Sequence, residues 1–301
     1  MKIGIIGMGW VGASVASSIL HAGVATELLL HDVRSALAEG EAMDLRHGAA
    51  FHPSATVQAT SIEEMQDADA VVIAAGKGGG PSDSRLDLLR TNAAIIGAIA
   101  SQLASLRGML VVVTNPVDLM TQVAAEASGL PLERVIGTGT MLDTARLRQA
   151  LGRRLDVDAR SIHAQVVGEH GDSEVVLWSL ARVGGNPVRS WPGWTAEDES
   201  AIAREVRTAA YEIIARKGAT NHAIGVVTST LLRWALRGTR RVLTVCRVQE
   251  GAMGIRDLAI SLPTIVGKDG AVEVLEPEVD ESEREALARS AETLRRARAS
   301  L

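Results

Sequence analysis

The sequence has little of what marks secreted, membrane or metal-dependent proteins. It contains one cysteine, Cys246, so no internal disulfide can form, and we expect a cytoplasmic protein with a buried structural thiol. No apolar run approaches the roughly 20 residues that a membrane span needs, and residues 1–7 enter a strand pattern without a signal-peptide cleavage site. Because the cysteine stands alone and the seven histidines are scattered, no metal site is expected.

The chain also lacks an excess of positive charge. Its net charge is −5 and no basic block occurs in the first two hundred residues, so a nucleic-acid partner is not indicated. The 301 residues are 47% hydrophobic and 22% charged, which is an ordinary balance for a globular protein. That length is enough for two packed cores.

The first half of the chain alternates short apolar runs with longer amphipathic ones. Continuous apolar strands separated by helices indicate a parallel sheet that is covered on both faces. We therefore predict a Rossmann-type, doubly wound α/β domain over residues 1–139. The predicted strands cover residues 3–7, 27–32, 70–75 and 109–114, and the predicted helices cover residues 10–22, 35–46, 85–106 and 116–128.

The second half, residues 140–301, is predicted to form an α+β domain that holds the substrate. Asp269 and Gly270 are a hairpin signal between two predicted strands. Glutamates early and arginines late in residues 281–298 complement a helix dipole and predict a terminal helix. The other predicted helices cover residues 142–151, 197–217 and 221–237, and the predicted strands cover residues 161–167, 241–248, 259–266 and 271–275.

A glycine-rich turn after the first strand predicts a dinucleotide site. The pattern G-x-G-x-x-G opens the first helix, and Asp32 follows twenty residues later at the end of the next strand. The glycines allow a tight turn, a close approach of the pyrophosphate and close helix packing, while Asp32 suits the ribose hydroxyls. The charge of Asp32 favours NAD over NADP, although Arg34 nearby weakens that preference. The residues assigned to the cofactor here are Gly7, Gly9, Trp10, Val11, Gly12 and Asp32.

Several polar residues are placed where they can form an active site. His170 follows a predicted strand in a glycine-containing loop, and Asp143 and Arg146 are three apart, on one face of a predicted helix. Asn115 ends another predicted strand, at the sheet edge where open α/β folds bind ligands. Arg85 follows a glycine cluster, residues 76–81. Each of these residues alone would be commonplace on a surface, so the interpretation depends on their combination.

Together these segments resemble the L-lactate and malate dehydrogenase superfamily over nearly the whole chain. Within that superfamily the chain looks most similar to bacterial L-lactate and L-2-hydroxyisocaproate dehydrogenases. Several motifs in the same order make a chance match improbable. The segments that carry the resemblance are residues 7–12, 43–48, 114–118, 135–148, 168–172 and 217–220.

The resemblance implies a hydride transfer between NAD and the 2-position of a small 2-hydroxy acid. His170 matches the acid/base, and Asp143 matches the partner that favours its protonated ring. Arg146 matches the clamp for the substrate carboxylate, and Arg85 matches the residue that polarises the carbonyl. Asn115 matches a hydrogen-bond donor near the substrate carbonyl and also contacts the cofactor.

Gly79 departs from the family pattern at a position that controls substrate choice. Lactate enzymes usually carry glutamine there and malate enzymes carry arginine, so glycine disfavours malate unless Lys77 supplies a compensating charge. The missing volume favours a 2-keto monocarboxylic acid with a side chain larger than that of pyruvate. The resemblance also places Thr220 and Ile224 around the inner pocket and the nicotinamide. It further implies that the loop of residues 76–84 closes over the substrate.

A second match suggests regulation by a sugar bisphosphate. Arg148 and His163 fall where bacterial lactate dehydrogenases bind fructose bisphosphate, at a subunit interface. The alternative to a larger substrate is therefore an ordinary L-lactate dehydrogenase activated by fructose bisphosphate. If there is no effector site, Arg148 forms a surface ion pair and His163 is a half-buried strand residue. Family resemblance implies a homodimer or homotetramer.

Two other classes of function were weighed against the dehydrogenase. A non-catalytic NAD-binding protein would share the fold, because fold alone does not establish function. Such a protein would not need His170, Asp143, Arg146, Arg85 and Asn115 together. An NAD-dependent glycosidase relative would use metal-assisted chemistry, for which the sequence offers no ligand cluster.

The assignment of His170 predicts a specific loss. His170→Ala should reduce turnover of the substrate by about 10²- to 10⁴-fold, since that is the usual contribution of a general acid or base. NAD binding should persist, because the dinucleotide site lies elsewhere in the sequence. Steady-state kinetics and cofactor titration measure the two effects separately, and unchanged turnover would contradict the assignment.

Overall fold

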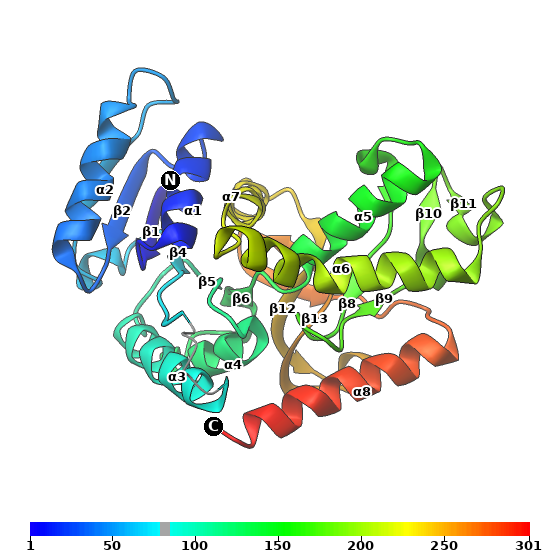
Figure 1. Ribbon diagram of the computed structural model, residues 1–301. Helices are drawn as coiled ribbons and strands as arrows, with labels where there is room; N and C mark the ends of the chain where they lie inside the picture. The colour runs from blue at the N-terminus through cyan, green and yellow to red at the C-terminus, as the bar shows by residue number, and fades with distance from the viewer. Residues whose placement is uncertain (79–84) are drawn as a thin grey trace.

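The first half forms six parallel strands with the topology of a dinucleotide-binding sheet (Figure 1). The structure, a computed structural model, describes residues 1–78 and 85–301. The strand order from the edge is β3-β2-β1-β4-β5-β6, which is the doubly wound order 3-2-1-4-5-6. The predicted Rossmann fold is confirmed. The strands are β1 (Lys2–Ile6), β2 (Glu27–His31), β3 (Thr56–Ala59), β4 (Ala70–Ile73), β5 (Met109–Val112) and β6 (Val135–Gly137).

Alternate residues of each strand enter different cores on the two faces of this sheet. On β1, Ile3 and Ile5 join one cluster, whereas Ile6 joins the other. Both faces are therefore apolar, which explains the continuous hydrophobic runs in the sequence. Helices α1 (Trp10–His21), α2 (Ser35–His47) and α7 (His222–Leu236) cover one face. The opposite face is covered by α3 (Arg85–Gln102), α4 (Val117–Ser128) and α8 (Glu281–Arg298).

Three strands of the second half extend the same sheet in antiparallel fashion. β12 (Arg241–Glu250) pairs with β6 through Cys246 and Gly137, and then with β13 (Arg256–Gly267). β13 pairs in turn with β14 (Gly270–Val274) through the predicted tight turn. The complete sheet has nine strands and crosses the proposed division between residues 139 and 140. Cys246 is buried in it, as expected.

The remaining second-half elements surround a third core. Helices α5 (Met141–Leu155) and α6 (Ala196–Lys217) pack there against small strands. β7 (Ile162–His163), β10 (Arg182–Val183) and β11 (Asn186–Pro187) form one small sheet, and β8 (Val166–Val167) pairs with β9 (Val175–Val176). The single 3₁₀ turns are Glu63–Met65, Leu132–Arg134, Ala159–Ser161, Trp178–Leu180, Val188–Ser190 and Ala252–Gly254.

The predicted strand 161–167 is wrong as a single element, because its two ends join different sheets. The backbone N–H of Val166 donates to Thr144 Oγ1 of α5 at 3.0 Å, and its carbonyl accepts from Thr140 Oγ1 at 2.6 Å. These side-chain bonds turn the backbone away from β7. Helix α3 also ends four residues before the predicted limit, at Gln102. No helix in the described residues is long and apolar enough to cross a membrane.

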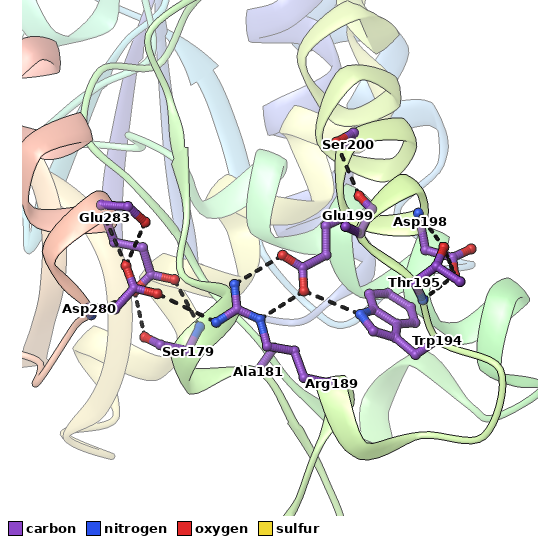
Figure 2. A network of polar contacts seen from close by, with 12 residues as sticks. Ser179, Ala181, Arg189, Trp194, Thr195, Asp198, Glu199, Ser200, Asp280 and Glu283 are labelled. Atoms are coloured by element: carbon purple, nitrogen blue, oxygen red, sulfur yellow. Dashed lines mark hydrogen bonds and ion pairs between the residues drawn. The ribbon is translucent and has the colours of Figure 1, made fainter.

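A polar network connects the start of α8 to Ser179 and to α6 (Figure 2). Glu283, 5% exposed, accepts from the backbone N–H of Ser179 at 2.8 Å and also from its hydroxyl. Asp280 and Glu283 form a capping box at the helix N-terminus. Arg189 lies between Glu199 of α6, at 2.8 Å, and Asp280, at 3.4 Å. The network thus joins α6 and α8.

Because Glu283 is buried and Arg189 is not, we predict that they contribute unequally to the stability of the fold. Glu283→Ala should lower the free energy of unfolding by about 2 kcal/mol, because it removes one half of the capping box and leaves the N–H and hydroxyl of the half-buried Ser179 without their acceptor. Arg189→Ala should cost less than ~1 kcal/mol, since the Arg189 side chain is 46% exposed. Urea unfolding of the two variants checks the order, and a larger loss for Arg189→Ala would refute it.

Candidate active site

The glycine-rich turn leaves open space at the start of α1. Gly7 has a φ of +96°, and an added Cβ would lie 2.4 Å from the backbone nitrogen of Ala75. A Cβ on Gly12 would lie 1.9 Å from the carbonyl oxygen of Gly7, so helix and turn can approach only without side chains. A Cβ on Gly9 would meet nothing within 4 Å. Backbone N–H groups at this helix start therefore face space that a pyrophosphate can occupy.

Asp32 is held in place at the end of β2 beside this turn. Its carboxylate accepts from the backbone N–H of Met8 at 2.8 Å and from that of Arg34 at 2.9 Å. Burial acts to raise the pKa of Asp32, but these bonds hold that pKa below its ordinary value. A carboxylate fixed at this position can accept hydrogen bonds from the two hydroxyls of a ribose that carries no 2′-phosphate. The Arg34 side chain, 69% exposed, lies 3.4 Å from the same carboxylate and offsets part of its charge.

The other predicted cofactor residues lie around the same end of α1. Trp10, at the first turn, is 61% exposed, whereas Val11 packs against the core beneath α1. Ile224 of α7 packs against the same core. The two helices are joined where Asn221 donates to Ser14 Oγ at 2.8 Å. The predicted cofactor residues of both halves thus share one region.

His170, Asp143 and Arg146 form a bonded group. The spacing of Asp143 and Arg146 predicted that they share a helix face, and the family resemblance implied that Asp143 is the partner of His170. The Nδ1 atom of His170 lies 2.5 Å from one oxygen of Asp143, and Arg146 Nη1 donates to the other at 2.7 Å. Asp143 is only 2% exposed, so one buried carboxylate is shared between two cationic groups. Burial opposes its charge, but His170 and Arg146 hold the pKa of Asp143 below its ordinary value.

Asp143 also controls the protonation of His170. Burial alone would lower the pKa of the imidazole, but the charge and hydrogen bond of Asp143 outweigh burial and raise the pKa to about 9. The ring is therefore an imidazolium at neutral pH. Because Nδ1 is bonded to Asp143, Nε2 is the atom left to exchange a proton with a ligand.

The loop that carries His170 is anchored by three distant elements. The backbone N–H of His170 donates to Asp118 of α4 at 2.8 Å. The preceding N–H, of Glu169, donates to Ser290 of α8 at 2.8 Å, and Gly168 pairs with Ser261 of β13. Burial raises the pKa of Asp118 to about 6. The loop is thus positioned through its backbone, which leaves the His170 ring available.

A cavity of about 450 Å³ lies in front of this group. It combines apolar side chains with convergent polar ones, as ligand sites commonly do. Asn115 is on its wall, as predicted, and the carbonyl of Asn115 accepts from the buried Asn92 amide at 3.2 Å. The lining residues are Leu88, Leu89, Asn115, Pro116, Asp143, Arg146, His170, Gly171, Asp172, Glu174, Arg207, Ala210, Tyr211 and Ile214.

Not every predicted site residue lines this cavity. Thr220 lines a neighbouring cavity, which Arg146 also borders. Gly79 and the greater part of the predicted closing loop, residues 79–84, lie outside the described residues. Arg85 is the first residue of α3, and its side chain also lies outside the description.

The two predicted effector residues lie near one another in the fold but face differently. Arg148 donates from Nε to the carbonyl of Ala164, next to His163, at 3.0 Å. Arg148 lines an apolar cavity of about 330 Å³ together with Arg160 and Arg241. His163, on β7, is exposed and is not among the residues that line this cavity.

Asp118, Glu174 and Arg207 are among the residues at the site that sequence reasoning did not assign. Asp118 belongs to the motif Asn115–Asp118, but nothing local shows that it binds a backbone group 52 residues away. Glu174 follows the His170 motif directly, and that position was the only signal. Arg207 is one of many charged residues on α6, and only the packing of α6 against α5 brings it to the cavity.

Comparison with known proteins identifies the class. Residues 1–137 match the model of the lactate/malate dehydrogenase NAD-binding domain, and residues 140–300 match that of the α/β C-terminal domain. The chain therefore belongs to the lactate/malate dehydrogenase family. It is an NAD-dependent oxidoreductase of the type that acts on the CH–OH group of its donor.

Individual relatives match over their whole length. The chain is 41% identical to L-lactate dehydrogenase 2 of Enterococcus faecalis, covering 100% of this chain and 97% of the relative. It is 42% identical to the L-lactate dehydrogenase of Thermus aquaticus, covering 100% and 99%. The crystal structure of a minor L-lactate dehydrogenase from Enterococcus mundtii in the ligands-bound form is 38% identical. It superposes with a TM-score of 0.97 over 100% of this chain and 98% of that one.

The contact between Asp143 and His170 predicts an unusual titration. In the ligand-free protein the His170 imidazole should titrate near pH 9 rather than 6.5, and Asp143→Asn should lower that midpoint by at least ~1 unit. Because the folded pKa is the higher one, the stabilisation is complete below pH 6.5 and is lost as pH rises through about 9. NMR of the ring signals measures the midpoint. A native value near 6.5 would contradict the interpretation.

Proposed function

We propose that the chain is an NAD-dependent L-2-hydroxy acid dehydrogenase that interconverts a 2-keto monocarboxylic acid and its L-2-hydroxy acid. The observation that carries this proposal is the bonded group of His170, Asp143 and Arg146 on one cavity wall. It offers a proton and a carboxylate clamp side by side. Residues 1–139 supply the cofactor site and residues 140–301 most of the substrate site, in a cytoplasmic enzyme.

His170 is the proposed acid/base. NADH, when bound, supplies the hydride that is added to the carbonyl carbon of the keto acid. The His170 imidazolium donates its Nε2 proton to the carbonyl oxygen, and the neutral ring accepts it back in the reverse direction. Asp143 remains ionised throughout, and so stabilises the charged ring and keeps its orientation. Asn115 donates a hydrogen bond to the carbonyl oxygen from the cavity wall.

Arg146 is the proposed clamp for the substrate carboxylate. A guanidinium has five N–H donors, and the described structure records one of these, on Nη1, bonded to Asp143. The bond to Asp143 holds the group on the cavity wall, and the guanidinium has further donors for a ligand. A planar fork pairs with a carboxylate through two bonds. Arg85, by its match to the family, is proposed to polarise the carbonyl.

The cavity wall supports a substrate with an apolar side chain. Leu88, Leu89, Ala210 and Ile214 line it. By the match to the family, glycine at position 79 replaces the larger residue that usually limits the substrate side chain. Thr220 and Ile224 are proposed to border the inner end near the nicotinamide. Arg207 is a second arginine on the wall, so a dicarboxylic keto acid has to be tested as well.

The second candidate function is an ordinary L-lactate dehydrogenase that is activated by fructose bisphosphate. Arg148, Arg160 and Arg241 line one cavity, and several cations together suit a phosphate group. Val226 and Val242 on its wall are 59% and 44% exposed, as residues of an interface between subunits would be. We propose a homodimer or homotetramer, with His163 contributed to the effector site across the interface.

The proposal predicts a ranking of substrates. Oxidation of NADH should be fastest with a monocarboxylic keto acid, either pyruvate or the larger 4-methyl-2-oxopentanoate or phenylpyruvate, because of the apolar cavity wall. Absorbance at 340 nm, with and without fructose bisphosphate, gives kcat/KM for each acid. Oxaloacetate used as efficiently as the best of these would contradict the proposed substrate class. Unchanged affinity and assembly with the sugar bisphosphate would remove the effector.

A further inference from the structure

Glu174 is a buried acid on the wall of the candidate active site with no assigned role. It lies four residues after His170, immediately before β9, and is 6% exposed. Its side chain lines the same cavity as His170, Asp143 and Arg146. The Oε1 atom is buried and has no hydrogen-bond partner among the described residues.

Other glutamates in the same part of the fold are satisfied. Glu283 is equally buried, yet its carboxylate accepts from the N–H and hydroxyl of Ser179. Glu169, in the same loop as Glu174, accepts from the N–H and hydroxyl of Ser173. An ionised carboxylate without such partners is costly to bury. Glu174 is therefore an exception that a structural role does not explain.

The groups facing Glu174 explain its protonation. Burial and the negative charge of Asp143 raise the pKa of Glu174 to about 8, although His170, Arg207 and Arg146 oppose the shift. These charges come from three parts of the fold: Asp143 and Arg146 from α5, His170 from the same loop, and Arg207 from α6. At neutral pH Asp143 and Glu174 together therefore carry one negative charge rather than two.

We propose that Glu174 is a positioning residue that acts through Asp143 and His170. As a neutral acid it leaves Asp143 as the anion that is bonded to both the imidazolium and the Arg146 clamp, while Asp118 of α4 faces His170 from the other side of its loop. As a carboxylate it adds a second anion, which strengthens the hold of His170 on its proton. This inference rests on the proposed function, in which that proton goes to the substrate.

The two groups titrate over an overlapping range of pH, because the pKa of Glu174 is raised to about 8 and that of His170 to about 9. Ionised Glu174 therefore adds a negative charge to the cavity while His170 still holds its proton. The new charge keeps the imidazolium present at higher pH, which extends reduction of the keto acid and delays oxidation of the hydroxy acid. Without Glu174, His170 should deprotonate earlier. Interacting groups of this kind titrate as a pair.

NMR of the ligand-free protein tests the inference without needing turnover. Glu174→Gln resembles the neutral acid in size and shape, and should lower the His170 midpoint by about 1 unit. Glu212→Gln is the matched control, because it removes one exposed carboxylate of α6 and should leave the midpoint unchanged. The ring signal of His170 is assigned by its absence from the spectrum of His170→Asn. In the unmodified protein this signal should also show a first inflection near pH 8, which requires no variant.

Kinetics give the second readout. The value to follow is kcat/KM for keto-acid reduction by Glu174→Gln, divided by that of the unmodified enzyme at the same pH. This ratio should fall about 10-fold between pH 7 and 9.5. A role of Glu174 in packing alone would change the ratio equally at every pH. Coincident His170 titrations in the two proteins, or a native signal without the first inflection, would overturn the role of Glu174. No turnover with any keto acid would instead refute the proposed function, and the titration would still decide the coupling.

Discussion

The structure of the candidate site depends on one buried carboxylate shared by two cationic groups. Asp143 is 2% exposed and bonds His170 on one oxygen and Arg146 on the other. The proton donor and the carboxylate clamp are thereby held at a fixed separation. Neither cation alone would compensate the burial of this anion as well, because each oxygen would otherwise need another donor. The same charge raises the pKa of His170, so geometry and protonation have one origin.

The rest of the fold brings this group to the cofactor. Asp143 and Arg146 are in the first two turns of α5, immediately after the last parallel strand, at the edge where the nucleotide turn also lies. The His170 loop comes from the second half and is anchored through its backbone to α4, α8 and β13. The His170 loop is thus positioned by elements distant in the sequence, whereas Asp143 and Arg146 are neighbours on one helix.

Local patterns were sufficient for the fold class and for much of the site. The glycine turn with Asp32, and the spacing of Asp143 and Arg146, are determined by the periodicity of a strand and a helix. The bond from His170 to Asp118 and the anchoring by Ser290 are not, because they join segments far apart in the chain. The break in the strand 161–167 depends on Thr140 and Thr144 at the start of α5, and only packing brings Glu174 and Arg207 of α6 to the same cavity. These features follow from packing, which no local pattern records.

The sheet that continues from β6 into β12 has an evolutionary consequence. Since Cys246 pairs with Gly137 through the backbone, the cofactor half and the substrate half are joined by secondary structure rather than by a flexible connection. The distance between the two ligand sites is then inherited with the sheet and depends little on which side chains pack around it. Such an enzyme can exchange most of its sequence, and even its substrate, without losing the alignment of its reactants. A TM-score of 0.97 at 38% identity to a relative is what that arrangement produces.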